Sequence, residues 1–231
     1  KAQQRGLEGM VLVEFDVDVG GKVINPKVIW SENEVFNPSA LKTVSSSIYK
    51  PALENGKPIL SKGLTQKHTF LLEGNENNLN LGKTFNNVLR DVKSGLRTGK
   101  VEKPIKKLDS LLARKNLDEI TRASLLYLKA SSLYRVEAPN EEIKNLLIES
   151  KQHYEEKIVQ CARGSVSVKS VTSMKLQTFG GILLGQMYFD ESSWEKTEKE
   201  LSEALLASKG TGLQSQRFYP AYLQLGMASY N

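Results

Sequence analysis

The sequence predicts an α+β protein: a small β-β-α-β antiparallel sheet domain followed by an all-α domain of helical hairpins. Up to about residue 74, apolar residues recur mostly at every second position, and Gly, Pro and Asn separate the runs, as is typical of strands and turns. Beyond the polar segment 75–82, which is rich in Asn and Gly, apolar residues recur every three to four positions, as in helices. We therefore expect domains at 1–74 and 83–231, joined by a linker at 75–82.

The first domain is expected to contain three strands and one helix. The strands are predicted at 10–19, 23–30 and 64–72, each with alternating apolar residues or turn residues at its ends. Gly20-Gly21 is expected to supply the positive φ angles of a hairpin turn. Asn37 is the expected N-cap of the helix, because Pro38 follows it and proline is favoured at the first helical position.

Three acidic residues, Glu14, Asp16 and Asp18, alternate with the apolar residues of the first predicted strand. A calcium-binding loop would need a further acidic or Asn ligand before its glycine and a glutamate six residues after it, where Gly20 and Lys27 stand. Alternation is the simpler explanation, and we interpret the acids as the solvent-facing side of the strand. No metal site is predicted.

No set of residues predicts catalysis or a cofactor. The two histidines, His68 on the last predicted strand and His153 in a predicted helix, share no metal-ligand spacing. We expect His68 to be a partly buried sheet residue and His153 to lie at the surface. The single cysteine, Cys161, excludes an internal disulfide and is expected to be a buried thiol on a helix. The sequence therefore predicts a protein that is not an enzyme.

The second domain is expected to be a series of helices with short connections, as in a helical repeat. The expected helices are 79–98, 101–115, 118–136, 140–162, 166–190, 193–209 and 215–231, with an irregularity at 156–172. Four basic residues are candidates for lining a groove between repeats, although a solvated surface is the simpler interpretation: Lys129, Arg135, Lys169 and Lys175.

Residues 1–74 resemble the C-terminal domain of the TonB family. The resemblance rests on several short motifs, in order and at the family's spacing: Lys1-Ala2-Gln3, Gly6-Leu7-Glu8-Gly9, Asp16-Val17, Gly20-Gly21-Lys22-Val23, Val28-Ile29-Trp30-Ser31, Tyr49-Lys50-Pro51-Ala52 and Asn55-Gly56-Lys57-Pro58. Ser47 departs from the pattern, because the family usually has an aromatic residue there.

The resemblance implies a non-enzymatic periplasmic domain, preceded in the family by an inner-membrane helix, that captures a short peptide of an outer-membrane transporter by strand addition. An exposed sheet edge offers unpaired N–H and C=O groups for this pairing. The edge implied here is the last strand, with Gln3 beside it. The candidate peptide-binding residues are Gln3, Leu64, Thr65, Gln66, Lys67, His68, Thr69, Phe70 and Leu71.

Part of the second domain resembles a tetratricopeptide repeat. Leu184-Gly185 with Tyr188 fits the first helix of such a repeat, and Leu201 and Ala204 fit the second. Gly185 would let the two helices approach closely. Such repeats commonly hold peptides, and a helical bundle serving as a spacer is the alternative.

Composition leaves several partner classes open. The net charge is +6, without a Lys/Arg block that alternates with aromatic residues, so nucleic acid is not an expected partner. The alternative to transporter coupling is a structural adaptor of the cell envelope, in which the repeats recruit proteins and the sheet edge is covered or forms a homodimer. Binding of the small domain to peptidoglycan is the third interpretation.

Overall fold

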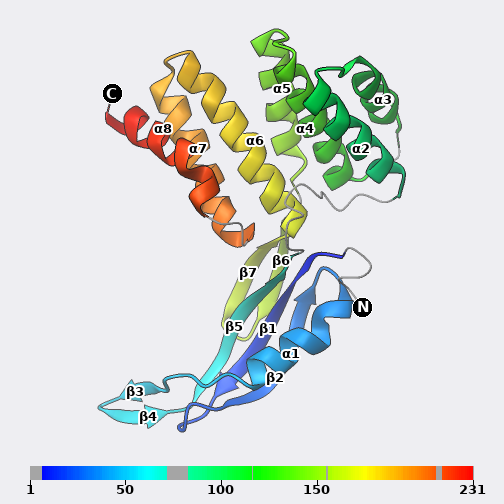
Figure 1. Cartoon of the computed structure of the whole chain (residues 1–231). Helices are drawn as coiled ribbons and strands as arrows, with labels where there is room; N and C mark the ends of the chain where they lie inside the picture. Colours follow the sequence, from blue (N-terminus) through cyan, green and yellow to red (C-terminus); the bar gives the residue numbers. More distant parts are fainter. Residues whose placement is uncertain (1–6, 72–82, 116, 155, 212–214, 231) are drawn as a thin grey trace. The chain divides into compact units, whose positions relative to one another are not determined.

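The chain divides into two compact units. The structure, a computed structural model, describes residues 7–71, 83–115, 117–154, 156–211 and 215–230 (Figure 1). The first of the two compact units, here called the sheet unit, comprises Lys1–Glu76 and Glu156–Val171. The second compact unit, here called the helical unit, comprises Asn77–Glu155 and Thr172–Asn231. The segment 156–171 therefore belongs with the sheet although it lies within the helical half of the sequence.

The predicted three-stranded antiparallel sheet with one helix across it is confirmed. Strands β1 (Gly9–Val17), β2 (Val23–Ser31) and β5 (Ser61–Phe70) form the sheet in the order β2-β1-β5. After β2 come a 3-10 turn, η2 (Glu34–Phe36), and helix α1 (Asn37–Ser45). The core between α1 and the sheet consists of alternate residues of β1 together with residues of η2 and α1: Val11, Val13, Phe15, Val17, Phe36, Ala40 and Val44.

The β1–β2 turn needs one glycine rather than two. Gly21 has a φ of +85°, and a Cβ atom there would lie 2.1 Å from the Tyr49 carbonyl oxygen. Gly20 is not among the residues with positive φ, so the prediction for Gly20 is wrong. Asp18 Oδ1 closes the turn by accepting from the backbone N–H groups of Gly20 and Lys22, each at 2.8 Å.

Two local predictions need correction. Asn37 is the first residue of α1, and Phe36 is its N-cap, with no side-chain capping bond. The capping side chain is that of Asn33, which accepts from Val35 N at 3.1 Å and starts η2 instead. The segment before β5, expected to be only a turn, also forms a short exposed hairpin of β3 (Ala52–Glu54) and β4 (Lys57–Ile59).

The largest departure from the predicted helices is a β-hairpin between α5 and α6. The expected helix 140–162 ends early, as α5 (Asn140–Gln152), and the next, α6 (Val171–Asp190), begins late. Between them β6 (Glu156–Cys161) pairs antiparallel with β7 (Gly164–Lys169). In β7, Val166 and Val168 alternate with serines, and this period of two fits a strand with one buried face. Cys161 is thus a strand residue rather than a helical one, and it is only partly buried.

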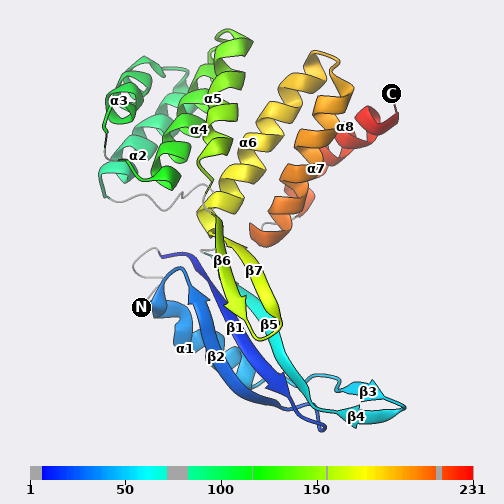
Figure 2. The ribbon, with the colours of Figure 1, turned by 180° about the vertical axis from the view of Figure 1, so that it is seen from behind.

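The remaining helices follow the predicted order (Figure 1, Figure 2). They are α2 (Lys83–Thr98), α3 (Glu102–Leu112), α4 (Glu119–Arg135), α7 (Trp194–Thr211), a 3-10 turn η3 (Ser215–Phe218) and α8 (Tyr219–Tyr230). Three apolar clusters among the described residues pack them together. One joins α2, α3, α4 and α6, the next joins α4, α5 and α6, and the last joins α6, α7 and α8. Within the described ranges, no helix has the length and apolarity needed to cross a membrane.

Helices α6 and α7 approach closely, as the packing argument for Gly185 requires. A Cβ atom at Gly185 would lie 2.5 Å from Leu201 Cδ2, and one at Gly181 would lie 2.8 Å from the Cβ of Ala204. Leu201 and Ala204 are fully buried. The glycines of α6 therefore make room for residues of α7.

Candidate strand-binding edge

Strand β5 is an outer strand of the sheet. Its one neighbour is β1, and no other strand in the described part of the chain pairs with its second edge. Residues Leu64 to Phe70 of the predicted site lie in β5, and Leu71 follows it directly. Gln3 lies outside the described residues, as do Leu72 at the end of the predicted strand and the linker 75–82.

The register shows which backbone groups of β5 face outward. In a strand, alternate residues point their N–H and C=O groups to opposite neighbours. The Met10 carbonyl accepts a hydrogen bond from Glu32 N, just beyond β2, at 2.9 Å, so the backbone groups of Met10 point toward β2. Those of the next residue, Val11, therefore point toward β5, where Val11 is paired with His68. His68 and the other even-numbered residues of β5 thus direct their backbone groups to β1. We infer that Thr65, Lys67 and Thr69 point their backbone N–H and C=O groups to the open edge.

The even-numbered residues of β5 face α1 and support the strand. Leu64 and Phe70 pack against the core, and the Phe70 ring stacks on Phe36 with centroids 4.6 Å apart. Gln66 accepts a hydrogen bond from the Tyr49 hydroxyl. His68 is partly buried, as predicted, and this burial lowers its pKa below the ordinary 6.5, so its ring is neutral at pH 7.

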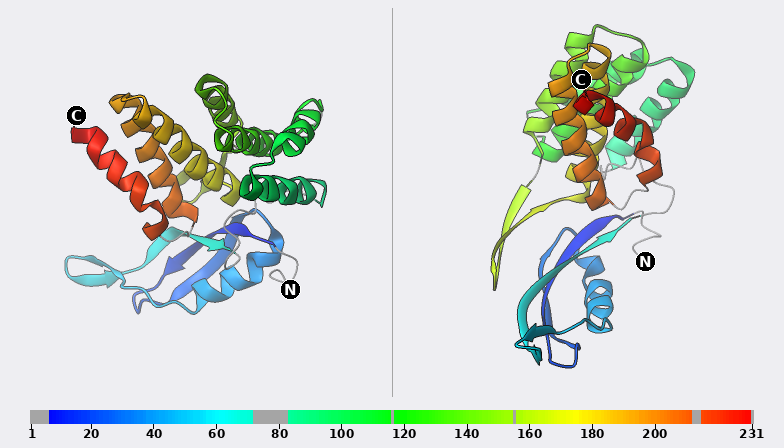
Figure 3. Two further views of the ribbon diagram at one scale, coloured as in Figure 1. Left: turned by 45° about the horizontal axis from the view of Figure 1, so that its top comes forward. Right: turned by 90° about the vertical axis from the view of Figure 1, so that its left-hand side faces the viewer.

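The sheet face opposite α1 is also covered. Met10 and Leu12, which face away from α1, are only 1% and 4% exposed. The β6–β7 hairpin lies on this side (Figure 3, right), and β6 contacts β2. Its turn reaches the start of β5, because a Cβ atom at Gly63 would lie 2.7 Å from that of Ala162. The sheet therefore has a layer on each face, while the β5 edge has no strand beyond it in the described chain.

Glu14 attaches the hairpin to the sheet, so its interpretation as a solvent-facing residue is wrong. Its side chain is buried, with Oε1 2.7 Å from Lys27 Nζ, and Oε2 accepts from Ala162 N at 2.7 Å. The hydrogen bond from Lys27, and after it that from the Ala162 N–H, holds the pKa of Glu14 below its ordinary value. Glu14 is buried because the β6–β7 hairpin covers the sheet face that the alternation of residues had assigned to solvent.

Asp16 fixes an irregularity at the beginning of β5. Its Oδ1 accepts from Gly63 N at 2.8 Å, and Oδ2 accepts from Asn25 Nδ2 at 3.0 Å; the Asn25 bond, then the Gly63 bond, lowers the pKa of Asp16. Gly63 has a φ of +63° and lies where the β1–β5 register shifts, as in a β-bulge. In the described ranges, no three His, Cys, Asp or Glu side chains are grouped so as to hold a metal ion.

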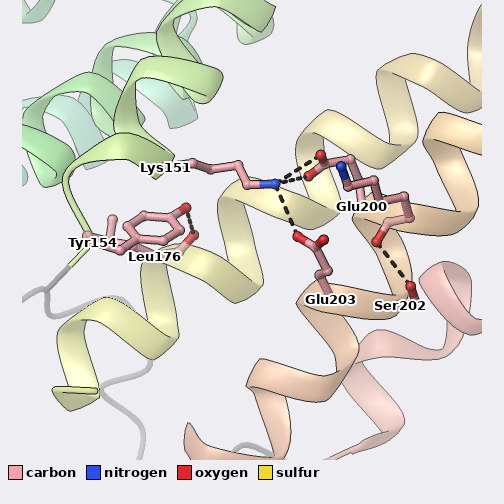
Figure 4. Close-up of polar contacts among 7 residues, drawn as sticks. Lys151, Tyr154, Leu176, Glu200, Ser202 and Glu203 are labelled. Carbon is pink, nitrogen blue, oxygen red and sulfur yellow. Dashed lines mark hydrogen bonds and ion pairs between the residues drawn. The ribbon is translucent and has the colours of Figure 1, made fainter. Parts of the chain in front are cut away.

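A polar cluster joins α5 and α7 in the helical unit (Figure 4). Lys151 Nζ lies 2.7 Å from Glu200 Oε2 and 3.3 Å from Glu203 Oε2, and the Tyr154 hydroxyl donates to the Leu176 carbonyl at 3.1 Å. Glu200 is almost fully buried. These contacts tie two helices together and offer no arrangement for catalysis.

The four basic residues proposed to line a groove do not form one set. Lys129 pairs with Asp109 at 2.8 Å, Arg135 Nε donates to a backbone carbonyl at 3.1 Å, and Lys169 lies in β7. Lys175 is 1% exposed, so it cannot line a surface groove.

His153 also differs from its prediction. It follows the last residue of α5, is partly buried, and contacts Glu119 through Nδ1.

Comparison with known protein families gives a match in the N-terminal part of the sheet unit. Residues 1–72 match the family described as Gram-negative bacterial TonB protein C-terminal. No curated protein matches the chain significantly.

Proposed function

We propose that this protein is a non-enzymatic interaction module of the Gram-negative cell envelope that captures an extended peptide segment on the open edge of β5. The observation that carries the proposal is the position of β5 as an outer strand with one neighbour in the described chain. The match of residues 1–72 to the TonB C-terminal family supports it and favours a periplasmic location and an outer-membrane transporter as the source of the peptide.

The helical unit would contribute a second contact in this proposal. Its helices pack in close pairs, as α6 and α7 do through Gly185 and Leu201, and this packing supports the resemblance to tetratricopeptide repeats. In this proposal the helical unit holds a second envelope protein while β5 holds the peptide. An inner-membrane segment upstream of Lys1 would provide the anchor.

The experiment is a titration of the isotope-labelled 231-residue chain with a short synthetic peptide of alternating Thr and Val. Strand capture predicts that the backbone amide signals of Thr65, Lys67 and Thr69 shift more than those of Gln66 and His68, whose N–H groups are directed to β1. Shifts confined to the helical unit, or none at all, would show that the edge does not capture strands.

A pair of variants at Lys67 separates the backbone from the side chain. Lys67→Pro removes the outward N–H and, on an edge strand, leaves the bonds to β1 in place. Since one hydrogen bond contributes about 1 kcal/mol net, we expect the affinity for the peptide to fall about fivefold. Lys67→Ala keeps the N–H and should bind the same neutral peptide as the wild type does. Equal binding by both variants would contradict pairing at this position.

A structural adaptor is the second candidate, because the β6–β7 hairpin comes from the helical half of the sequence and belongs to the sheet unit. In an adaptor the β5 edge would be covered, by another part of the chain or by a second copy. Hydrogen exchange on the free chain distinguishes the two functions. Fast exchange of the amides of Thr65, Lys67 and Thr69 supports peptide capture, and strong protection of these amides supports the adaptor. If that protection is lost when the protein is diluted, a second copy covers the edge and the protein is a homodimer. Sedimentation with purified peptidoglycan at low and high salt tests the third interpretation.

A further inference from the structure

The hairpin turn places a basic residue against the beginning of β5. The turn joins β6 to β7 at Ala162 and Arg163, and Arg163 Cγ lies 3.4 Å from the position that a Cβ atom would take at Gly63. Gly63 has no side chain, so the turn can lie directly against the beginning of β5. Arg163 is exposed, and neither a hydrogen bond nor an ion pair from its guanidinium is seen within the described residues.

Strand β5 adds further positive charge on the same face of the sheet. Lys67 is paired with Leu12, whose side chain faces the hairpin, so the Lys67 side chain lies on that face, and it is exposed. Lys62 is exposed near the bulge, and it lies close enough to the Asp16 carboxylate for the two charges to offset each other in part. Strand β5 itself contains no acidic residue.

Two carboxylates lie near this face, and the contacts seen for them are with groups other than Arg163 and Lys67. Glu14 accepts from Lys27 and Ala162, and Asp16 accepts from Gly63 and Asn25. Arg163 and Lys67 form no ion pair within the described chain, so both positive charges remain available to a strand added to β5. Gly63, against which Arg163 lies, and Lys67 are four residues apart along β5, or about 13 Å at the usual rise of a strand.

We infer that the captured segment carries acidic side chains at positions i and i+4, one facing Lys67 and one facing Arg163. Residues at i and i+4 of a strand point to the same face, whereas residues at i and i+3 point to opposite faces. Charge complementarity thus selects both the composition and the spacing of the partner. The inference rests on the proposed capture of a strand by β5. It adds that the inserted β6–β7 hairpin makes the sheet unit prefer strands with this acidic spacing.

The test compares three labelled peptides of alternating Thr and Val on the 231-residue chain, by fluorescence anisotropy at low and high salt. One carries Asp at i and i+4, one carries Asp at i and i+3, and one carries Asn at i and i+4. Two exposed ion pairs should make the first peptide bind about fivefold tighter than the Asn peptide, with the difference shrinking as salt rises. The second peptide should gain about half as much, because only one of its acids can face the hairpin side.

Charge reversal identifies the residue responsible. Arg163→Glu should remove the preference for the i, i+4 acidic peptide. The control is Arg114→Glu, at an exposed position of the helical unit, which changes the net charge equally and should preserve that preference. Equal binding of the two acidic peptides, or equal effects of the two variants, would indicate general attraction of anions to a basic protein and would overturn the inference. If the Asn peptide shifts no amide of β5, the proposed strand capture fails instead.

Discussion

Gly185 provides the sharpest test of the packing between α6 and α7, through the variant Gly185→Ala. The added methyl would lie 2.5 Å from Leu201 Cδ2 and 2.7 Å from Leu201 Cγ. Leu201 is 0% exposed, so its side chain cannot avoid the added methyl by turning out into solvent. Gly226 in α8 is the matched control, since it also follows a leucine in a helix and a Cβ atom there has no neighbour within 4 Å.

The two variants should shift stability in opposite directions. Replacing Gly by Ala inside a helix stabilises it by about 1 kcal/mol, because the unfolded chain loses conformational freedom. Gly226→Ala should show this gain alone. In Gly185→Ala the gain is opposed by overpacking, which costs about 1–3 kcal/mol in a filled core. The expected net result for Gly185→Ala is a loss of up to about 2 kcal/mol, so the two variants should differ by about 1–3 kcal/mol.

Urea unfolding followed by helical circular dichroism measures both changes at constant temperature. Leu201→Ala provides a cycle: in that background Gly185→Ala should become stabilising by about 1 kcal/mol, because the clashing atoms are gone. If Gly185→Ala stabilises the wild-type chain as much as Gly226→Ala does, the close approach of α6 and α7 is wrong.

Three further predictions concern particular residues. The pKa of Glu14 is lowered from its ordinary 4.5 in the folded state. Its carboxylate therefore stabilises the fold above that pH, and this contribution is lost as the pH falls through the lowered pKa. The unfolding midpoint of Glu14→Gln should depend less on pH than that of the wild type between about 3 and 6, roughly the range over which a carboxyl titrates. Gly21→Ala would place an L-residue at a positive φ with its Cβ 2.1 Å from a carbonyl oxygen, so it should lower the free energy of unfolding by well over 2 kcal/mol. The control is Gly56→Ala, whose φ is also positive but whose surroundings are open, and it should cost about 1 kcal/mol. Thermal unfolding measures both changes. Lys151→Met leaves the buried carboxylate of Glu200 without its cation and should lower stability by about 2 kcal/mol, whereas an unchanged urea midpoint would show that the ion pair contributes nothing.

The period of apolar residues predicted the sheet, α1 and most helices because apolar residues that share a face recur at the period of the element. Val11, Val13 and Phe15 alternate in β1, and that pattern depends only on neighbours in sequence. The same reasoning failed at 156–169, where a short strand pair lies between two long helices. The alternation of Val166 and Val168 with serines was the available signal, but it covers few residues and is easily read as the end of a helix.

The sequence by itself determined the three-stranded sheet with one helix in 1–71, the last strand as the candidate edge, and the glycine that lets α6 and α7 approach. The sheet and its helix follow from local periodicity and turn chemistry, and the glycine follows from side-chain size. The choice of edge is what the resemblance to the TonB C-terminal domain implies. Only the tertiary structure decided that Glu14 is buried and that Arg163 lies beside β5. The first depends on a contact between residues 148 positions apart, Glu14 and Ala162, and the second on a contact between Gly63 and the hairpin turn. No local pattern encodes which distant segment covers a sheet face.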